Sequence, residues 1–165
     1  MKNKKYFPMF LDLTGKNVVI VGGGKTAVKR ARTVLQFTRN VTVIADHVVP
    51  EMTELSRTGR ITLHQRLVKR SDIQEAFLVL TATSDERLND DIYRLCKDEG
   101  IYVNIQNDRE KSDFQFPGIY IKNDVVVGVS ASGLDSEEAR TVSQAVQTAL
   151  EKAFGTIKHF PMRRD

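Results

Sequence analysis

The amino-acid sequence predicts an α/β fold in which helices cover both faces of a parallel sheet. Short, almost wholly apolar runs such as Val18–Val21 are typical of strands that are buried on both faces. Amphipathic stretches of helical length separate these runs, and this alternation indicates a parallel sheet with helical crossovers. Because such crossovers are right-handed, we expect a Rossmann-type doubly wound parallel sheet, although the sequence leaves the strand order open.

The first part of the chain accounts for this sheet. We expect strands at residues 18–21, 41–45, 61–64, 77–81 and 101–105, and helices at residues 26–37, 51–57 and 86–98. The polar run of Thr83, Ser84 and Asp85 is the expected N-cap of the last of these helices, and Gly100 is its expected end.

The character of the sequence changes after Asn107, where a polar run precedes Phe114 and Pro117. We therefore predict two domains, a nucleotide-binding domain at residues 1–112 and a small α+β dimerisation segment at residues 113–165. This segment contains an expected hairpin at 118–122 and 125–129, followed by an amphipathic helix at 136–154. A hairpin with one helix is too small for a stable core of its own, so we expect a homodimer.

Composition limits the classes of protein that the chain can represent. At 165 residues it has room for one full core, and 41% hydrophobic and 28% charged residues are ordinary for a soluble globular protein. The net charge of +4 is mildly basic, but no aromatic-flanked RNA motif accompanies it, so we expect no nucleic-acid partner. No apolar run approaches the roughly 20 residues that span a membrane. With no apolar signal core near the N-terminus and Cys96 as the single cysteine, we predict a cytoplasmic protein without disulfides.

A glycine-rich turn lies between the first strand and the first helix. Gly22, Gly24 and Ala27 have the spacing G-x-G-x-x-G/A, in which the first glycine makes a tight turn and the second lets a phosphate approach the backbone. The small third residue allows the helix to pack closely. Amides at the start of that helix would face the pyrophosphate of a nicotinamide cofactor. The same turn without a ligand is the alternative. The expected cofactor-binding residues here are Gly22, Gly23, Gly24, Lys25, Thr26 and Ala27.

Two further segments are expected to line the cofactor site. Asp46 follows the second strand, where Rossmann proteins present an acid to the adenosine ribose, and such an acid favours NAD over NADP. Asp46 could instead cap or solvate the turn, and the neighbouring His47 could be an exposed loop residue. At the carboxyl end of another strand, where open α/β sheets bind ligands, we expect contributions from Thr81, Ala82, Thr83 and Asp85.

Several motifs together resemble those of the precorrin-2 dehydrogenases of siroheme synthesis. They are Tyr6-Phe7-Pro8-Met9-Phe10-Leu11-Asp12-Leu13, the Gly22 turn, Thr81-Ala82-Thr83-Ser84-Asp85, Asn104, and Phe114 to Pro117. The resemblance implies NAD-dependent oxidation of the tetrapyrrole precorrin-2 to sirohydrochlorin. For bifunctional members it also implies insertion of ferrous iron. A chain end at Asp165, which omits most of the helical extension of longer relatives, disfavours that second activity.

The resemblance also implies the catalytic and substrate residues. Family members commonly carry Asn-Val-Val-Asp, and their aspartate is regarded as the key residue, whereas this chain has Asn104, Ile105, Gln106 and Asn107. An amide cannot accept a proton near neutral pH, so a general base there would be lost unless the next residue, Asp108, substitutes for it. Asp108 could also be a solvated loop acid. Asn104 is an expected substrate contact.

A second departure affects residues 130–136, where the first glycine and the proline of the family pattern are missing. Ser130 and Ser132 are expected to face the tetrapyrrole, or else to form a strand end that leads into a helix N-cap at Asp135. Arg140 keeps its family position and is expected to pair with a substrate carboxylate. No metal site is expected, because His64 and His159 have no second ligand at suitable spacing. The remaining alternative to a dehydrogenase is a catalytically impaired carrier or sensor that binds a nucleotide, a tetrapyrrole or a metal.

Overall fold

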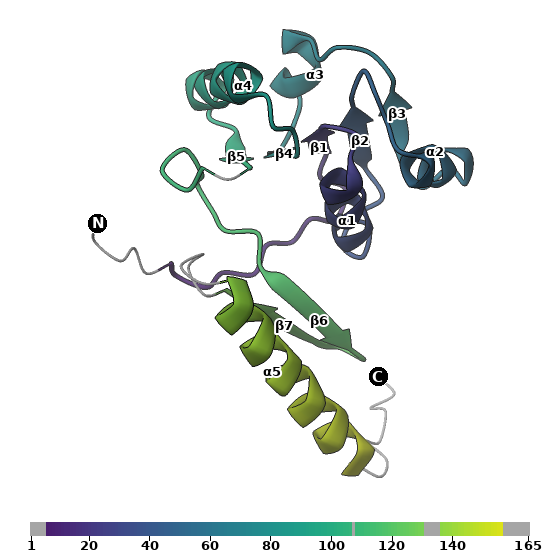
Figure 1. Cartoon of the computed structure of the whole chain (residues 1–165), viewed down its shortest axis with the longest axis vertical. Coiled ribbons are helices and arrows are strands. Elements are labelled where there is room, and N and C mark those ends of the chain that lie inside the picture. The colour runs from purple at the N-terminus through teal and green to yellow at the C-terminus, as the bar shows by residue number, and fades with distance from the viewer. Residues whose placement is uncertain (1–5, 107, 131–135, 157–165) are drawn as a thin grey trace. The chain divides into compact units, whose positions relative to one another are not determined.

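The computed structural model describes residues 6–106, 108–130 and 136–156. The chain divides into two compact units, Met9–Gln115 and a second that combines Phe116–Asp165 with Met1–Pro8. The first unit contains a five-stranded sheet, and the second contains a two-stranded sheet (Figure 1).

The five-stranded sheet is parallel throughout and has the order β3-β2-β1-β4-β5. Its strands are β1 (Val18–Val21), β2 (Val41–Ile44), β3 (Thr62–His64), β4 (Leu78–Thr81) and β5 (Tyr102–Asn104). The helices are α1 (Lys25–Val34), α2 (Pro50–Arg57), α3 (Arg70–Gln74) and α4 (Glu86–Glu99). The strand order reverses between β1 and β4, and ligands of doubly wound sheets bind at such a switch point. The predicted Rossmann-type fold is confirmed.

Helices cover both faces of this sheet (Figure 1). On one face, Val19 and Val21 of β1 belong to a buried cluster with Ile73 of α3 and Ile92 and Cys96 of α4. Each large aliphatic side chain buried in this way contributes about 1.5–3 kcal/mol. On the other face, α1 and α2 bury their own apolar residues, which are Ala27, Val28, Ala31, Val34, Met52 and Leu55. The prediction that Cys96 is a core residue is confirmed, and burial raises the pKa of its thiol to about 12.

The capping residues of α4 are those that the sequence predicts, and the helix extends one residue beyond the predicted 86–98. Asp85 is the N-cap, and its Oδ1 accepts a hydrogen bond from the Leu88 amide at 3.1 Å, an arrangement worth about 1 kcal/mol. Gly100 is the C-cap, and its φ of 68° is in the left-handed region that glycine adopts without strain.

Other element boundaries differ from the prediction. The helix expected at 26–37 ends at Val34, because the amides of Phe37 and Thr38 both donate to the Val34 carbonyl and close a turn. The strands expected at 41–45, 61–64, 77–81 and 101–105 are each shorter by one or two residues. Helix α3 was not predicted, because it has only 5 residues and buries only Ile73, too little for a periodic pattern.

The second unit contains the predicted hairpin and helix. Strands β6 (Gly118–Lys122) and β7 (Val125–Val129) pair in antiparallel register, and Asn123 takes the positive φ of 51° that the tight turn requires. Helix α5 (Ser136–Thr156) packs against both strands and ends two residues later than predicted. The expected N-cap, Asp135, lies outside the described residues. No helix in the described part of the chain is both long and apolar enough to cross a bilayer.

Candidate functional site

The glycine turn after β1 has a backbone that only glycine accommodates at its first position. Gly22 has a φ of 125°, and a Cβ atom there would lie 2.5 Å from the Ala82 carbonyl oxygen. The Gly22 amide donates to the Ile44 carbonyl at 2.9 Å, so the turn is held between the ends of β2 and β4. This position makes the tight turn that the sequence motif predicts.

The next two glycines differ in what surrounds them. A Cβ atom on Gly23 would lie 2.0 Å from the His47 carbonyl oxygen, so this residue has to be glycine for the chain itself to pack. A Cβ atom on Gly24 would meet no heavy atom within 4 Å, so nothing in the protein requires glycine there. The space beside Gly24 is therefore free for a ligand that approaches the backbone.

The N-terminus of α1 is suited to an anion. Gly24 is its N-cap, no side chain caps the helix, and its first turn contains no acidic residue. The first amides of a helix have no intrahelical acceptor, and the helix dipole favours negative charge at this end. Lys25 and Thr26 are exposed beside these amides, and Ala27 is fully buried, which gives the close helix packing expected of the third motif position.

A hollow of ≈ 290 Å³ opens over the glycine turn at the carboxyl ends of the strands. It brings together seven of the predicted cofactor residues, namely Gly22, Gly23, Gly24, Asp46, His47, Ala82 and Thr83. The residues that line it come from the ends of β1, β2 and β4, from the loops after β3 and β4, and, with Leu88, from the first turn of α4. This position is the switch point at which doubly wound sheets bind their ligands.

Asp46 and His47 form an exposed pair at the edge of the hollow. The His47 amide donates to Asp46 Oδ1 at 2.9 Å, and His47 Nδ1 lies 3.1 Å from Asp46 Oδ2. Desolvation alone would raise the pKa of Asp46, but the hydrogen bonds from the His47 side chain and backbone lower it below its usual value. At neutral pH the edge of the hollow therefore carries a negative charge.

The segment after β4 combines structural and lining residues. Thr81 is fully buried and does not line the hollow; its hydroxyl accepts a hydrogen bond from the Gln106 amide at 2.8 Å, and its carbonyl accepts one from Arg30 at 2.6 Å. Asp85 caps α4, so its carboxylate is committed to the helix. Of the four predicted residues in this segment, Ala82 and Thr83 lie where a cofactor could contact them.

The end of β5 holds the predicted catalytic segment. Asn104 is buried, and its Nδ2 donates to the Phe114 carbonyl at 2.8 Å while its Oδ1 has no hydrogen-bond partner among the described residues. Asp108 Oδ1 accepts a hydrogen bond from the Lys111 amide at 3.1 Å, and its Oδ2 lies 3.6 Å from Lys111 Nζ. The Asp108 carboxylate thus closes a turn. Asn107 lies outside the described residues.

The predicted substrate residues of the second unit lie around the start of α5. Ser130 follows β7, Arg140 lies in the first turns of α5, and both are exposed. Ser132 lies outside the described residues.

Sequence reasoning missed the loop after β3. Arg66, Leu67 and Val68 line the hollow, and Leu67 is 72% exposed despite its large apolar side chain. A leucine in a polar loop carries no signal in the sequence, so only the pairing of β3 with β2 identifies this loop as part of the site.

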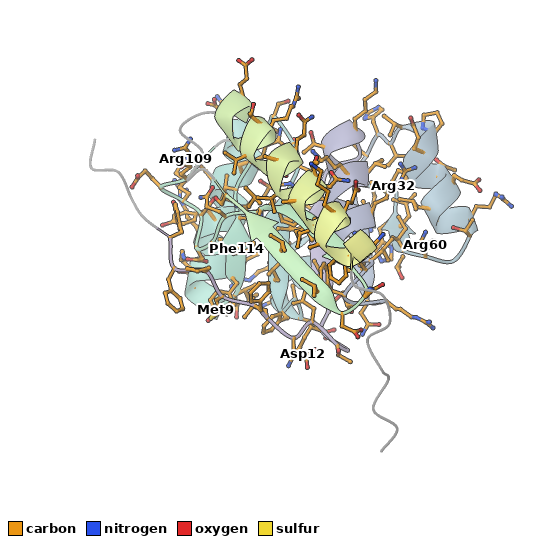
Figure 2. The ribbon with its side chains drawn as sticks, turned by 90° about the horizontal axis from the view of Figure 1, so that it is seen from below. Met9, Asp12, Arg32, Arg60, Arg109 and Phe114 are labelled. Carbon is orange, nitrogen blue, oxygen red and sulfur yellow. The ribbon has the colours of Figure 1, made fainter. Side chains whose placement is uncertain are left out.

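Charged side chains also gather along α1. A second hollow, of ≈ 340 Å³, follows α1 from Lys25 along Lys29 and Arg32, and Glu51 of α2 also lines it. Arg32, Arg60 and Arg109 occupy separate places on the sheet unit (Figure 2). No group of three or more His, Cys, Asp or Glu residues in the described ranges could hold a metal ion. His64 is exposed on the edge strand β3.

The sheet order, the glycine turn and the hollow together define a Rossmann-type dinucleotide-binding protein. A family model described as "Putative NAD(P)-binding" matches residues 9–118. The chain belongs to this family, and the resemblance to precorrin-2 dehydrogenases and the N-terminal part of siroheme synthases is confirmed.

Relatives and a solved structure agree with this assignment. The chain is 34% identical over 142 residues to the "Probable multifunctional siroheme biosynthesis protein HemA" of Ruminiclostridium josui, covering 86% of this chain and 28% of that protein. It is 31% identical over 159 residues to the siroheme synthase of Nitrosococcus oceani, covering 96% of this chain and 34% of that protein. The chain thus spans about a third of the length of these curated relatives. The structure of "SirC, precorrin-2 dehydrogenase" shares the fold, with a TM-score of 0.73 at 22% identity over 87% of this chain and 70% of that one.

Proposed function

We propose that this protein is an NAD-dependent precorrin-2 dehydrogenase that produces sirohydrochlorin. The observation that carries the proposal is the open space at Gly24, beside an uncapped helix N-terminus in the switch-point hollow. The relatives, a siroheme biosynthesis protein and a siroheme synthase, together with the precorrin-2 dehydrogenase SirC, support the substrate class.

The residues of the hollow fit a nicotinamide dinucleotide. The amides at the start of α1 would bind the pyrophosphate, and the Asp46 carboxylate would accept hydrogen bonds from the adenosine ribose after releasing His47, which is itself exposed. When bound, NAD accepts a hydride. The negative charge of Asp46 would repel the additional phosphate of NADP, so the proposal specifies NAD.

The proposed reaction removes one hydride and one proton from precorrin-2. The hydride carries both electrons to NAD, and we assign the proton to Asp108, the carboxylate next to the position that the family pattern gives to aspartate. The protein contributes mainly by holding the two reactants in a productive orientation.

Purified protein incubated with precorrin-2 and NAD is expected to form NADH and sirohydrochlorin in equal amounts, which absorbance measures directly. With NADP in place of NAD, we expect affinity to fall by about tenfold, since repulsion of one phosphate by a carboxylate is of that order. A protein that binds NAD but does not oxidise precorrin-2 would refute the proposed dehydrogenase activity. Equal affinity for the two cofactors would refute the role of Asp46.

A second candidate function is a carrier or sensor that has kept the fold without the chemistry. It is favoured by Asn107 at the family's aspartate position and by the hydrogen bond that commits Asp108 to the turn of Lys111. This candidate would bind NAD or a tetrapyrrole but leave precorrin-2 unchanged in the same assay.

We also propose that the second unit forms a homodimer. Val142 on α5 is 46% exposed and Val125 at the start of β7 is 41% exposed, so this small unit leaves apolar surface uncovered. Sedimentation equilibrium is expected to give twice the mass of 18.6 kDa, and Val142→Asp is expected to shift the protein toward the monomer. A single-chain mass at all concentrations would rule the dimer out.

A further inference from the structure

An ion pair between Arg66 and Asp72 lies beside the ribose end of the proposed cofactor site. Strands β2 and β3 are neighbours, with Ile44 paired to His64. Asp46 and Arg66 each follow two residues after this pair, and both line the hollow. The acid expected at the ribose and an arginine therefore lie at the same end of adjacent strands.

Both Nη atoms of the Arg66 guanidinium have partners in the adjoining segment, which are Asp72 of α3 and the Leu67 carbonyl. Arg66 Nη1 and Nη2 donate to the two carboxylate oxygens of Asp72, each at 2.7 Å, and Nη1 also donates to the Leu67 carbonyl at 3.0 Å. The Asp72 side chain is only 11% exposed. Hydrogen bonding from Arg66 lowers the pKa of Asp72 to about 2, so the pair is ionised and closed at neutral pH.

An arginine near the ribose is the usual receptor for the additional phosphate of NADP in Rossmann proteins, whereas an acid there favours NAD. We propose that Asp72 withholds Arg66 from the 2′-phosphate of NADP and thereby acts with Asp46 to select NAD. Asp72 is then a specificity residue that works through another side chain and does not touch the cofactor. The inference rests on the proposed cofactor site.

The variant Asp72→Asn tests this directly. Asparagine keeps an oxygen that can accept the Lys69 amide, as Asp72 does at 2.7 Å, so α3 keeps its cap. Titration of the full chain with NAD and with NADP is expected to show NADP binding about tenfold tighter than in the wild type, because Arg66 is released to a doubly charged partner. NAD binding should change by less than about twofold. Asp72→Ser should have the same effect, which keeps the test decisive if the asparagine variant is unstable.

Two controls isolate the guanidinium. In the double variant Asp72→Asn, Arg66→Gln, the gain in NADP affinity should disappear, because the released cation is gone. Glu54→Gln breaks a similar two-bond pair with Arg57, both bonds at 2.8 Å, on α2 and away from the hollow, and it should leave both affinities unchanged.

The opposite results would overturn the inference. One such result is that both Asp72 variants still bind NAD but show an unchanged affinity for NADP. Another is that the gain in NADP affinity persists in the double variant without Arg66. A third is that Glu54→Gln shows an equal gain in NADP affinity. A wild-type protein that binds neither cofactor would refute the proposed function, and this inference with it.

Discussion

Replacing Gly24 with alanine is expected to abolish most NAD binding while leaving the protein folded. A Cβ atom at this position meets no heavy atom within 4 Å, and the backbone φ of −83° is one that alanine adopts readily. The added methyl group would instead occupy the space in which the pyrophosphate approaches the helix amides. We expect NAD affinity to fall by about tenfold or more and the melting temperature to change by less than about 2 °C.

The matched control is alanine at the preceding residue. The Cβ atom of Gly23→Ala would lie 2.0 Å from the His47 carbonyl oxygen, a backbone atom that cannot move away cheaply. This variant should lose several degrees of melting temperature even without a ligand. Isothermal titration with NAD and thermal unfolding of both variants separate the two effects. If Gly24→Ala binds NAD as tightly as the wild type, the pyrophosphate does not lie at this helix.

Most of the fold could be predicted because it depends on local patterns. The apolar run Val18–Val21, the capping residue Asp85 and Gly100 at the end of α4 each have a physical cause within a few residues of sequence. Helix α3 has no such signal, because its short length leaves only Ile73 to bury. Strand order was also beyond the sequence, since it depends on contacts between distant segments.

The candidate site could be predicted only in part, for the same reason. The glycine motif is local, and the structure shows that packing excludes a Cβ atom at Gly22 and Gly23 but not at Gly24. Arg66 and Leu67 line the hollow only because β3 lies next to β2, and no local sequence pattern reveals that pairing. The sequence likewise presented Thr81 as a cofactor contact, whereas its hydroxyl is buried against the Gln106 amide.

The prediction with the largest expected effect on turnover concerns Asn107 and Asp108, which follow Gln106 in the sequence. If Asp108 takes the proton from precorrin-2, Asp108→Asn should lower kcat by about 100-fold, because an amide cannot act as a base and a positioned base contributes at least that much. Its oxygen can still accept the Lys111 amide, so the turn should survive. Adding Asn107→Asp to this variant restores a carboxylate at the family's aspartate position and should recover much of the lost rate.

The kinetics distinguish a lost base from a damaged loop. Asp90 also pairs with Lys111, at 2.5 Å, so Asp90→Asn removes a partner of the same lysine without touching Asp108. This control should keep its kcat, and NAD affinity should stay constant across the whole series, since neither Asp90 nor Asp108 is among the residues that line the hollow. If Asp108→Asn and Asp90→Asn slow the reaction equally, Asp108 acts only through the turn. If Asp108→Asn retains full turnover, the proton leaves to solvent, and this chain carries out the oxidation by orienting precorrin-2 and NAD alone.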